Sequence, residues 1–423
     1  MEVKEPTAKY LGRPHFKQTE VGVIPEEWEV KSLREFGKFE KGIGLLKEDI
    51  KATGSTPAIP YTALYTDFSE ILNYNHIRWF VDDTSRTYIV SEPCVLIASS
   101  SNMAANTGKA SALTETKPVA VGREVIIFKT ASNCRYISYQ LSTSPYRRRT
   151  LSLARGTTIK HLYPATFLNY KIALPPFPEQ RAIAETLSDA DALIESLEQL
   201  LTKKRQINQG AMQELLTGKR RLLGFSGEWE ETILGEVADV IKGRGLSRAK
   251  VTASATQPCI LYGELFTVYG RTITNVVSRT DSDEGLASVS DDILMPGSTT
   301  TTGIDLATAS ALLVDGVALG GDINVIRRKA QDYEATFLAN YLTHAKRIAI
   351  AEIAQGITIH HLYGRDLRCL ALQLPSLSEQ TAIAAVLCDM DEDVVVLEAK
   401  LNKARQLKQG MMQELLTGRI RLV

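Results

Sequence analysis

Two short stretches of the chain place a glycine before hydroxyl and basic side chains. Residues 156–161 read GTTIKH, and residues 356–361 read GITIHH. Glycine lets a ligand approach the backbone closely, and hydroxyl and backbone N–H groups donate hydrogen bonds to phosphate oxygens. Both stretches are therefore candidate phosphate-binding loops, and a plain turn explains the pattern almost equally well. The adjacent pair His360 and His361 indicates a loop contact far more than a metal site.

The first of these loops lies in a basic segment without any acid. Residues 135–165 carry six basic side chains interleaved with tyrosines, namely Arg135, Tyr136, Tyr139, Tyr146, Arg147, Arg148, Arg149, Arg155, Lys160 and Tyr163. A basic side chain that replaces a counterion on a nucleic-acid phosphate gains free energy by releasing that ion. The segment therefore predicts a polyanion-binding face, with a solvated basic surface as an equal alternative. The second half is weaker, because Glu352 accompanies Lys346, Arg347 and Arg365.

The candidate DNA contacts join both loops to basic and tyrosine residues placed earlier in each half. In the first half they are Lys41, Tyr61, Lys109, Arg147, Arg148, Arg149, Arg155, Thr157, Thr158, Lys160 and His161. In the second half they are Lys242, Arg244, Tyr262, Thr358, His360 and His361.

Patterns that would indicate catalysis are missing from the sequence. Residues 174–177 read LPPF, whereas adenine-N6 methyltransferases carry NPPF, and Leu174 cannot form the hydrogen bond that their asparagine makes to the exocyclic amine. No glycine-rich cofactor fingerprint, phosphate loop of an ATPase, HExxH motif or GxSxG elbow occurs. The five cysteines form no CxxC pair. We therefore predict no enzymatic activity, no metal and no cofactor.

Composition places the chain among ordinary globular proteins of more than one domain. It has 423 residues, 44% of them apolar and 23% charged, and one domain typically takes about 150 residues. Residues 1–16 lack the apolar stretch of a signal peptide, and no run reaches the ~18 apolar residues of a membrane span, so we expect a cytoplasmic protein. The 49 basic and 49 acidic residues balance, which lowers the odds of nucleic-acid binding unless the charges are segregated.

The chain is internally duplicated. Residues 178–217 recur at 378–417 with 22 of 40 positions identical and no gap. The same offset relates the two glycine-containing loops, and residues 27–29 recur at 228–230. Similarity fades between these anchors. The pattern predicts two divergent globular domains, each followed by a well-matched segment.

The matched segments have the periodicity of coiled-coil helices. Apolar residues alternate steps of four and three at Ile183, Leu187, Ala190, Ile194, Leu197 and Leu201, and again at Ile383, Leu387, Met390, Val394, Leu397, Leu401 and Ala404. Gly218 and Gly418 are the expected stops. A helix of forty residues spans about 60 Å, which favours a coiled coil over the alternative of an amphipathic helix buried in one core.

The segments between the helices mix strand and helix patterns. Residues 95–97, 125–128 and 323–326 are predicted strands, and residues 136–141 and 336–350 are predicted helices. We expect an α+β fold with two mixed α/β domains that are related by a pseudo-twofold axis and separated by a long antiparallel two-helix coiled coil. The expected boundaries are 1–170 for the first domain, 171–220 for the first helix, 221–370 for the second domain and 371–423 for the second helix.

These motifs resemble those of the specificity subunit of type I restriction-modification systems over nearly the whole chain. Residues 19–33 read TEVGVIPEEWEVKSL, the helix starts read LPPFPEQRAIAETL and LPSLSEQTAIAAVL, and the helix ends read QELLTGKRRL and QELLTGRIRL. The resemblance implies two target-recognition domains that each read half of a bipartite asymmetric DNA site. It implies helices that bind two methyltransferase (modification) subunits, an indirect association with restriction/translocase subunits, and no catalysis by this chain.

The best-matched residues at the two helix starts are the candidate partner-binding surface. They are Glu179, Gln180, Ala182, Ile183, Leu187, Glu379, Gln380, Ala382, Ile383 and Leu387. Two alternatives to the resemblance remain, namely a coiled-coil adaptor that touches no nucleic acid and a standalone DNA-binding repressor. Salt-dependent binding to duplex DNA excludes the first alternative, and co-purification with a methyltransferase excludes the second.

Overall fold

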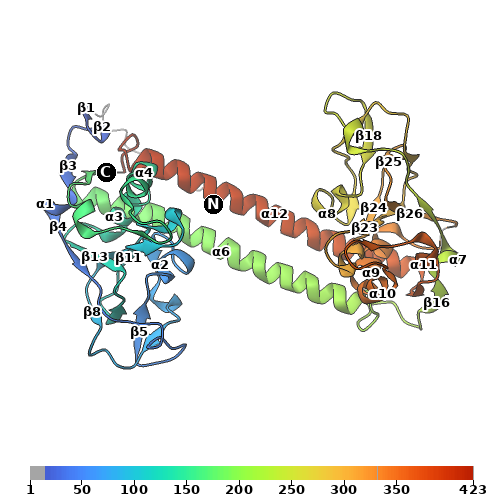
Figure 1. Cartoon of the computed structure of the whole chain (residues 1–423), viewed down its shortest axis with the longest axis horizontal. Coiled ribbons are helices and arrows are strands. Elements are labelled where there is room, and N and C mark those ends of the chain that lie inside the picture. The colour runs from blue at the N-terminus through green and yellow to red at the C-terminus, as the bar shows by residue number, and fades with distance from the viewer. Residues whose placement is uncertain (1–14, 331, 423) are drawn as a thin grey trace, which may run out of the picture. The chain divides into compact units, whose positions relative to one another are not determined.

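The structure is a computed structural model that describes residues 15–330 and 332–422. The chain divides into two compact units, whose elements are labelled in Figure 1. Unit 1 combines residues up to 197 with residues from 400 onward, and unit 2 consists of residues 198–399. Each unit holds one mixed α/β domain and a part of both long helices. Most of the segment used for the signal-peptide expectation lies outside the described residues.

A five-stranded sheet forms the centre of unit 1. Its strand order is β4 (Gly37–Lys41), β13 (Val125–Thr130), β9 (Cys94–Ala98), β11 (Ala110–Leu113) and β6 (Ile71–Leu72). Neighbouring strands are antiparallel except for the parallel pair β11 and β6. The residues of β9 are all buried, as expected for an apolar strand covered on both faces. The strands predicted at 95–97 and 125–128 are confirmed.

Smaller sheets and short helices complete the domain of unit 1. A four-stranded sheet has the order β7 (Phe80–Val81), β5 (Thr56–Ile59), β12 (Val119–Val121) and β8 (Tyr88–Val90). The two-stranded pairs are β1 (Phe16–Thr19) with β2 (Gly22–Pro25), β3 (Glu29–Ser32) with β15 (Lys171–Leu174), and β10 (Ser100–Ser101) with β14 (Lys160–His161). The α-helices are α1 (Leu33–Phe36), α2 (Ala63–Thr66), α3 (Cys134–Gln140), α4 (Ser144–Leu153) and α5 (Pro164–Phe167).

Unit 2 repeats the same strand order. Its five-stranded sheet is β17 (Ala238–Lys242), β26 (Ile323–Arg328), β22 (Asp292–Pro296), β24 (Ser310–Leu312) and β19 (Thr272–Ile273). Its four-stranded sheet is β20 (Arg279–Thr280), β18 (Gln257–Ile260), β25 (Ala318–Leu319) and β21 (Leu286–Ala287), and its pairs are β16 (Glu230–Ile233) with β28 (Ala371–Leu374) and β23 (Ser298–Thr299) with β27 (His360–His361). The predicted strand at 323–326 is confirmed.

The helices of unit 2 show one departure from the sequence pattern. They are α7 (Leu234–Val237), α8 (Glu264–Thr267), α9 (Ala335–His344), α10 (Arg347–Ile353) and α11 (Gly364–Arg368). The prediction of one helix over 336–350 is wrong, because α9 ends at His344 and α10 begins at Arg347. Buried residues of α9 pack against β22 and β24, whereas Ile348 of α10 is exposed. The prediction assumed that all apolar residues from 336 to 350 face the core as one helix, which is not the case.

The two long helices are α6 (Phe177–Leu215) and α12 (Leu377–Leu415), each of 39 residues. In unit 2 their parts run antiparallel, because Arg205 pairs with Glu398 while Asn208 contacts Asp391 further back along the partner. Gly218 and Gly418 follow the helices with φ of +68° and +71°, as a C-terminal glycine cap requires. The part of the chain that the structure describes contains no helix long and apolar enough to cross a membrane.

The helix starts are built into the domain cores. Ile183 and Leu187 are fully buried with Trp28 and Tyr136 in unit 1. Further along the predicted seam, Ile194 and Leu197 are only half-buried. Each long helix therefore begins as a core helix, which is the alternative weighed above, and continues with the heptad seam.

Candidate nucleic-acid interface

Both glycine-containing loops have the same backbone geometry. In unit 1, Arg155 and His161 exchange backbone N–H···O bonds of 3.0 and 2.7 Å, and in unit 2, Gln355 and His361 do so at 2.9 and 2.7 Å. We call residues 155–161 and 355–361 the clasp loops. His161 pairs with Ser100 of β10, which fixes the first clasp loop to the sheet edge.

Glycine is required at the head of each clasp loop. Gly156 and Gly356 both have φ of +117°, a conformation that side chains with a Cβ rarely adopt. A Cβ on Gly156 would also clash with the carbonyl oxygen of Ile159, and one on Gly356 would clash with that of Ile359. Both clasp loops are therefore turns with the same backbone conformation at their glycine, although their side chains differ.

The clasp loops expose some of their predicted contact residues to solvent, whereas Lys160, His161, His360 and His361 are half-buried. Arg155, Thr157 and Thr158 are exposed in unit 1, and Thr358 is exposed in unit 2. Lys160 Nζ donates to the carbonyl of Gly156 at 2.5 Å, so its ammonium stays beside the loop. The sequence analysis did not name the isoleucines of these loops as candidates. The structure shows that Ile357 is 95% exposed.

An acidic residue lies beside each clasp loop, close to basic residues that are predicted DNA contacts. Glu124 lies 4.0 Å from Lys41 Nζ and 3.8 Å from His161 Nδ1 in unit 1. In unit 2, Asp322 lies 3.0 Å from Lys242 Nζ and also accepts a hydrogen bond from Ser298. The structure thus brings Lys41 together with His161.

The acids at the clasp loops were missed by the sequence analysis. Burial alone would raise the pKa of Asp322, but the Ser298 hydroxyl and the Lys242 ammonium outweigh burial and lower that pKa. Asp322 therefore stays ionised and offsets part of the local positive charge. Glu124 and Asp322 sit one or two residues after glycines, Gly122 and Gly321, before strands β13 and β26, and an alignment of the halves at this point could have found them.

Arg147 is the predicted phosphate contact that the structure places differently. Its guanidinium donates to the carbonyls of Ala105 and Thr107, the latter at 3.2 Å, and burial lowers its pKa. These contacts engage the Arg147 guanidinium within the fold, which argues against its use as a phosphate contact. Arg148 and Arg149, its neighbours on α4, are exposed.

Other candidates are also partly committed to the fold. Lys109 Nζ donates to the carbonyl of Phe68 at 2.8 Å and is half-buried, and burial lowers its pKa. The predicted basic face included Tyr136, Tyr139 and Tyr146, but all three are fully buried. These tyrosines form the core of unit 1, so that part of the interpretation is wrong. Arg244 and Tyr262 are exposed and Tyr61 is half-buried.

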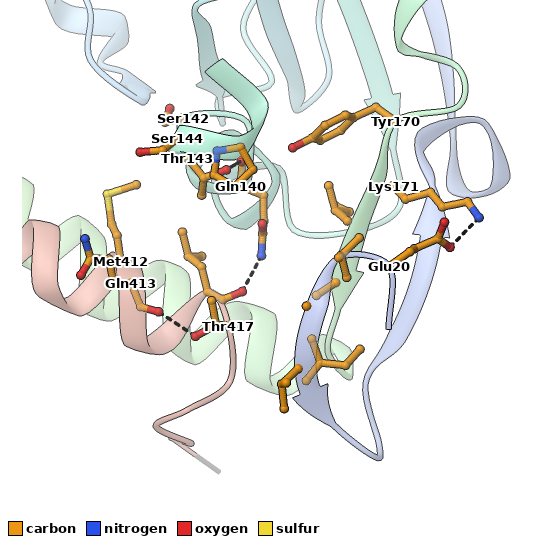
Figure 2. Close-up of a pocket in the computed structure, with 18 of the residues that line it drawn as sticks. Glu20, Gln140, Ser142, Thr143, Ser144, Tyr170, Lys171, Met412, Gln413 and Thr417 are labelled. Atoms are coloured by element: carbon orange, nitrogen blue, oxygen red, sulfur yellow. Dashed lines mark hydrogen bonds and ion pairs between the residues drawn. The ribbon is translucent and has the colours of Figure 1, made fainter. Parts of the chain in front are cut away.

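A large open groove lies in unit 1 near the hairpin of β1 and β2 and the end of α12 (Figure 2). Its volume is about 1240 Å³. Lys171 pairs with Glu20 at 2.6 Å on one side, and Gln140 Nε2 donates to the carbonyl of Leu416 at 2.9 Å on the other. Arg149 of the predicted contacts also lines the groove. Arg419, which also lines the groove, pairs with Glu414 at 3.1 Å.

The predicted partner-binding residues turn inward in unit 1. Glu179 is fully buried and accepts hydrogen bonds from Trp28 Nε1 at 2.9 Å and Arg421 Nη2 at 2.8 Å. Gln180 accepts from the backbone N–H of Asn133 at 3.0 Å and donates to the carbonyl of Pro175 at 2.9 Å. The helix start is thereby fixed to the domain and to the chain after α12.

Unit 2 repeats the arginine and glutamine contacts but not the tryptophan contact. Glu379 binds Arg221, whose Nη2 lies 2.5 Å away, and Gln380 accepts from Glu334 N at 3.0 Å and donates to Pro375 at 2.9 Å. The prediction that these positions form a partner-facing surface is therefore wrong for eight buried residues, namely Glu179, Gln180, Ile183, Leu187, Glu379, Gln380, Ile383 and Leu387. Ala182 and Ala382 are half-buried. The eight buried residues therefore match between the two halves because they make the same contacts within the chain.

Apolar side chains are instead exposed along the outer faces of the long helices. Leu193 of α6 and Leu407 of α12 are exposed in unit 1. In unit 2 the exposed apolar residues of these helices include Leu200, Ile207, Val395 and Val396. Over residues 15–330 and 332–422, no group of three His, Cys, Asp or Glu residues could hold a metal ion.

Comparison with known proteins points to one family. The family model for the type I restriction modification DNA specificity domain matches residues 25–208 and again residues 226–406. The putative type I restriction enzyme MjaX specificity subunit of Methanocaldococcus jannaschii is 25% identical, and the match covers 98% of each chain.

Solved structures share the fold. The type I restriction-modification S subunit from M. genitalium has a TM-score of 0.60 at 16% identity, covering 95% of this chain and 98% of that one. A chain from a structure on complex assembly and conformational transition of the type I R-M system has a TM-score of 0.53 at 15% identity, covering 94% and 99%. With two family matches that together span most of its sequence, the chain belongs to the type I restriction-modification DNA specificity family.

Proposed function

We propose that the chain is the DNA-recognition subunit of a type I restriction-modification complex and that each unit binds one half of a bipartite, asymmetric DNA site. The observation that supports this most is the duplicated clasp loop, in which glycine, hydroxyl and basic groups meet at the surface of both units. Phosphate oxygens are suitable acceptors for this set of groups. The domains between the matched segments differ in sequence, which fits two different half-sites.

Phosphate contact in unit 1 belongs to the exposed members of the predicted set. These are Arg148, Arg149, Arg155, Thr157 and Thr158, with Lys160 at the edge of the loop. In unit 2 the corresponding contacts come from Arg244, Thr358 and His360. Phosphate contacts position the duplex and carry no sequence information, so base reading belongs to other residues of the divergent domains.

Two methyltransferase subunits bind the outer faces of α6 and α12, and restriction subunits join through them. The exposed apolar residues of these helices support this assignment, because apolar side chains in a row on a helix favour packing against another helix. The helices hold the two units apart as an antiparallel coiled coil. We infer that the chain acts in the cytoplasm and leaves catalysis to its partner subunits.

The test is DNA binding by the chain assembled with a methyltransferase subunit of a type I restriction-modification system that forms a complex with it. Affinity for a duplex that carries the methylated site is measured from about 50 to 200 mM salt, a range over which phosphate contacts lower affinity steeply. We expect the R148A/R149A/R155A variant to weaken binding to every sequence alike and to flatten the salt dependence. Exposed lysines outside the long helices supply the matched control, K38A/K47A/K219A.

Two outcomes would contradict the proposal. A complex that assembles but shows no salt-dependent DNA binding would indicate a coiled-coil adaptor. Transfer of label from S-adenosylmethionine to DNA by the chain alone would show that it is an enzyme.

A further inference from the structure

The ends of the two long helices are close to identical, yet each must dock on a different domain. Residues 200–222 and 400–422 agree at 15 of 23 positions. Their shared arginines make equivalent contacts, Arg421 with Glu179 in unit 1 and Arg221 with Glu379 in unit 2. These shared contacts cannot distinguish the correct pairing of helix end and domain from the exchanged pairing.

One of the differing positions lies inside the contact with the domain. In unit 1 it is Lys408, whose side chain is only 13% exposed and whose Nζ lies 2.7 Å from Glu70 and 2.6 Å from Asp191. The Tyr139 hydroxyl donates to Asp191 at 2.6 Å. Burial alone would raise the pKa of Glu70, but the Lys408 ammonium outweighs burial and lowers it. One cation on the helix thus pairs with two acids of the domain and helix start, Glu70 and Asp191.

The charges are arranged the other way round in unit 2. The helix residue is Asn208, whose amide donates to the carbonyl of Met390 at 3.1 Å and to Asp391 at 3.3 Å. Asp391 also binds Arg271 Nη1 at 2.5 Å. The cation therefore comes from the domain, and the helix contributes a neutral side chain.

Glu70 and Arg271 occupy equivalent places in the two domains. The Glu70 carbonyl accepts from Ala112 N at 2.8 Å immediately before β6, and the Arg271 carbonyl accepts from Ala311 N at 2.7 Å immediately before β19. The change from Lys408 to Asn208 on the helix is thus matched by the change from Glu70 to Arg271 on the sheet edge, while Asp191 and Asp391 stay the same.

We propose that these residues determine which helix end docks on which domain, with Lys408 selecting Glu70 in unit 1 and Asn208 selecting Arg271 in unit 2. In the exchanged pairing, Asn208 would leave Glu70 and Asp191 together without the helix cation, and Lys109 alone would remain nearby. Lys408 would meet Arg271 in unit 2, where burial, Arg271 and Arg347 already lower the pKa of His344. Two acids that lose their buried cation, and two cations that share the single carboxylate of Asp391, are both unfavourable. This selection does not depend on what the chain binds.

The test exchanges the charges within the full-length chain. The N208K/K408N variant mismatches both contacts, and adding E70R/R271E matches them again in the exchanged order. Each protein is unfolded, refolded at micromolar concentration and analysed by light scattering for species above the mass of the wild type. We expect the mismatched variant to increase the higher-mass fraction about threefold or more, since mispaired helix ends join separate chains, and the fourfold variant to restore the wild-type value.

A smaller set of variants tests the proposal even if the variant with all four substitutions fails to fold. In unit 1 alone, K408N is compared with K408N/E70R, and the second substitution is expected to recover most of the thermal stability that the first removes. K403N is the matched control, because Lys403 lies on the same helix and is exposed. The proposal is overturned if N208K/K408N refolds as the wild type does, or if neither E70R nor E70R/R271E restores any stability or homogeneity.

Discussion

Units 1 and 2 share their strand order and clasp geometry but differ in the side chains that the clasp loops present. Arg155 of unit 1 corresponds to Gln355, Thr157 to Ile357 and Lys160 to His360. The backbone of the loop depends on glycine and on paired strands, which both units keep. The comparison teaches that the frame and the contact surface are separable, so one unit can change its contacts without losing its fold.

The units also differ at the start of their long helices. In unit 1, Trp28 donates its indole N–H to Glu179 at 2.9 Å. In unit 2, Trp229 Nε1 is buried without a hydrogen-bond partner among the described residues. Glu379 therefore receives one donor fewer than Glu179, although both bind an arginine. The same sequence motif thus anchors the two helices with different strength.

The largest predicted effect separates these two anchors. E179A removes the acceptor that Arg421 and Trp28 share and leaves Arg421 with Glu27 alone, so we expect it to lower the free energy of unfolding of unit 1 by about 3 kcal/mol. E379A should lower that of unit 2 by about 1 kcal/mol less, because one hydrogen bond fewer is lost. Hydrogen exchange during urea unfolding reports on each unit, and E185A, on the exposed face of α6, is the control. Equal losses in both units would show that the indole contributes nothing.

A second prediction tests whether the clasp backbone serves each half-site separately. We expect G156A to reduce affinity about tenfold through one half-site and G356A to do so through the other, because each strains the loop. G22A is a matched control, since Gly22 has φ of +115° but a Cβ there would meet no atom within 4 Å. Competition with duplexes altered in one half-site measures the effect. If G22A weakens binding as much, general backbone strain is the cause.

A third prediction exchanges the charge difference between the clasp loops. R155Q should reduce the slope of log K against log salt by about 0.9, and Q355R should increase it by about the same amount. The preference for sequence should stay unchanged in both variants. A changed site preference with an unchanged slope would mean that this position reads bases.

The smallest predicted effect concerns the gap between the half-sites. Matched insertions of four helical residues after Thr202 and after Leu397 lengthen both helices by about 6 Å, close to two base pairs at about 3.4 Å each. We expect the unread gap to grow by one or two base pairs while each unit keeps its half-site. Genome-wide mapping of methylated sites checks this. Altered half-sites with the original gap would show that the helices do not set the spacing.

The repeat made the paired domains and the long helices predictable from sequence. Identity at a constant offset is a local signal, and so is the heptad step that runs from Ile183 to Leu201. The predicted strands at 95–97 and 125–128 lie within β9 and β13, whose apolar residues are consecutive in sequence. Local patterns of this kind need no knowledge of distant partners.

The candidate site was less predictable because burial depends on distant contacts. Glu179 has the residue type of a surface position, but Trp28 and Arg421 enclose it from 151 and 242 positions away. Arg147 looks like its exposed neighbours in sequence, and its hydrogen bonds to Ala105 and Thr107 are what distinguish it. Matching residues between the halves therefore identified structural anchors as readily as surfaces.

The assembly of unit 1 from both ends of the chain has a consequence for its biosynthesis. Lys408 contacts Glu70 from 338 positions away, and Arg421 contacts Glu27 from 394. At about 10 residues per second, the ribosome needs roughly 20 s to make residues 198–399 after unit 1's domain has emerged. The domain that is translated first is therefore completed last. During that interval, the site that later receives the end of α12 stays uncovered on the nascent chain, whereas unit 2 is synthesised as one continuous stretch.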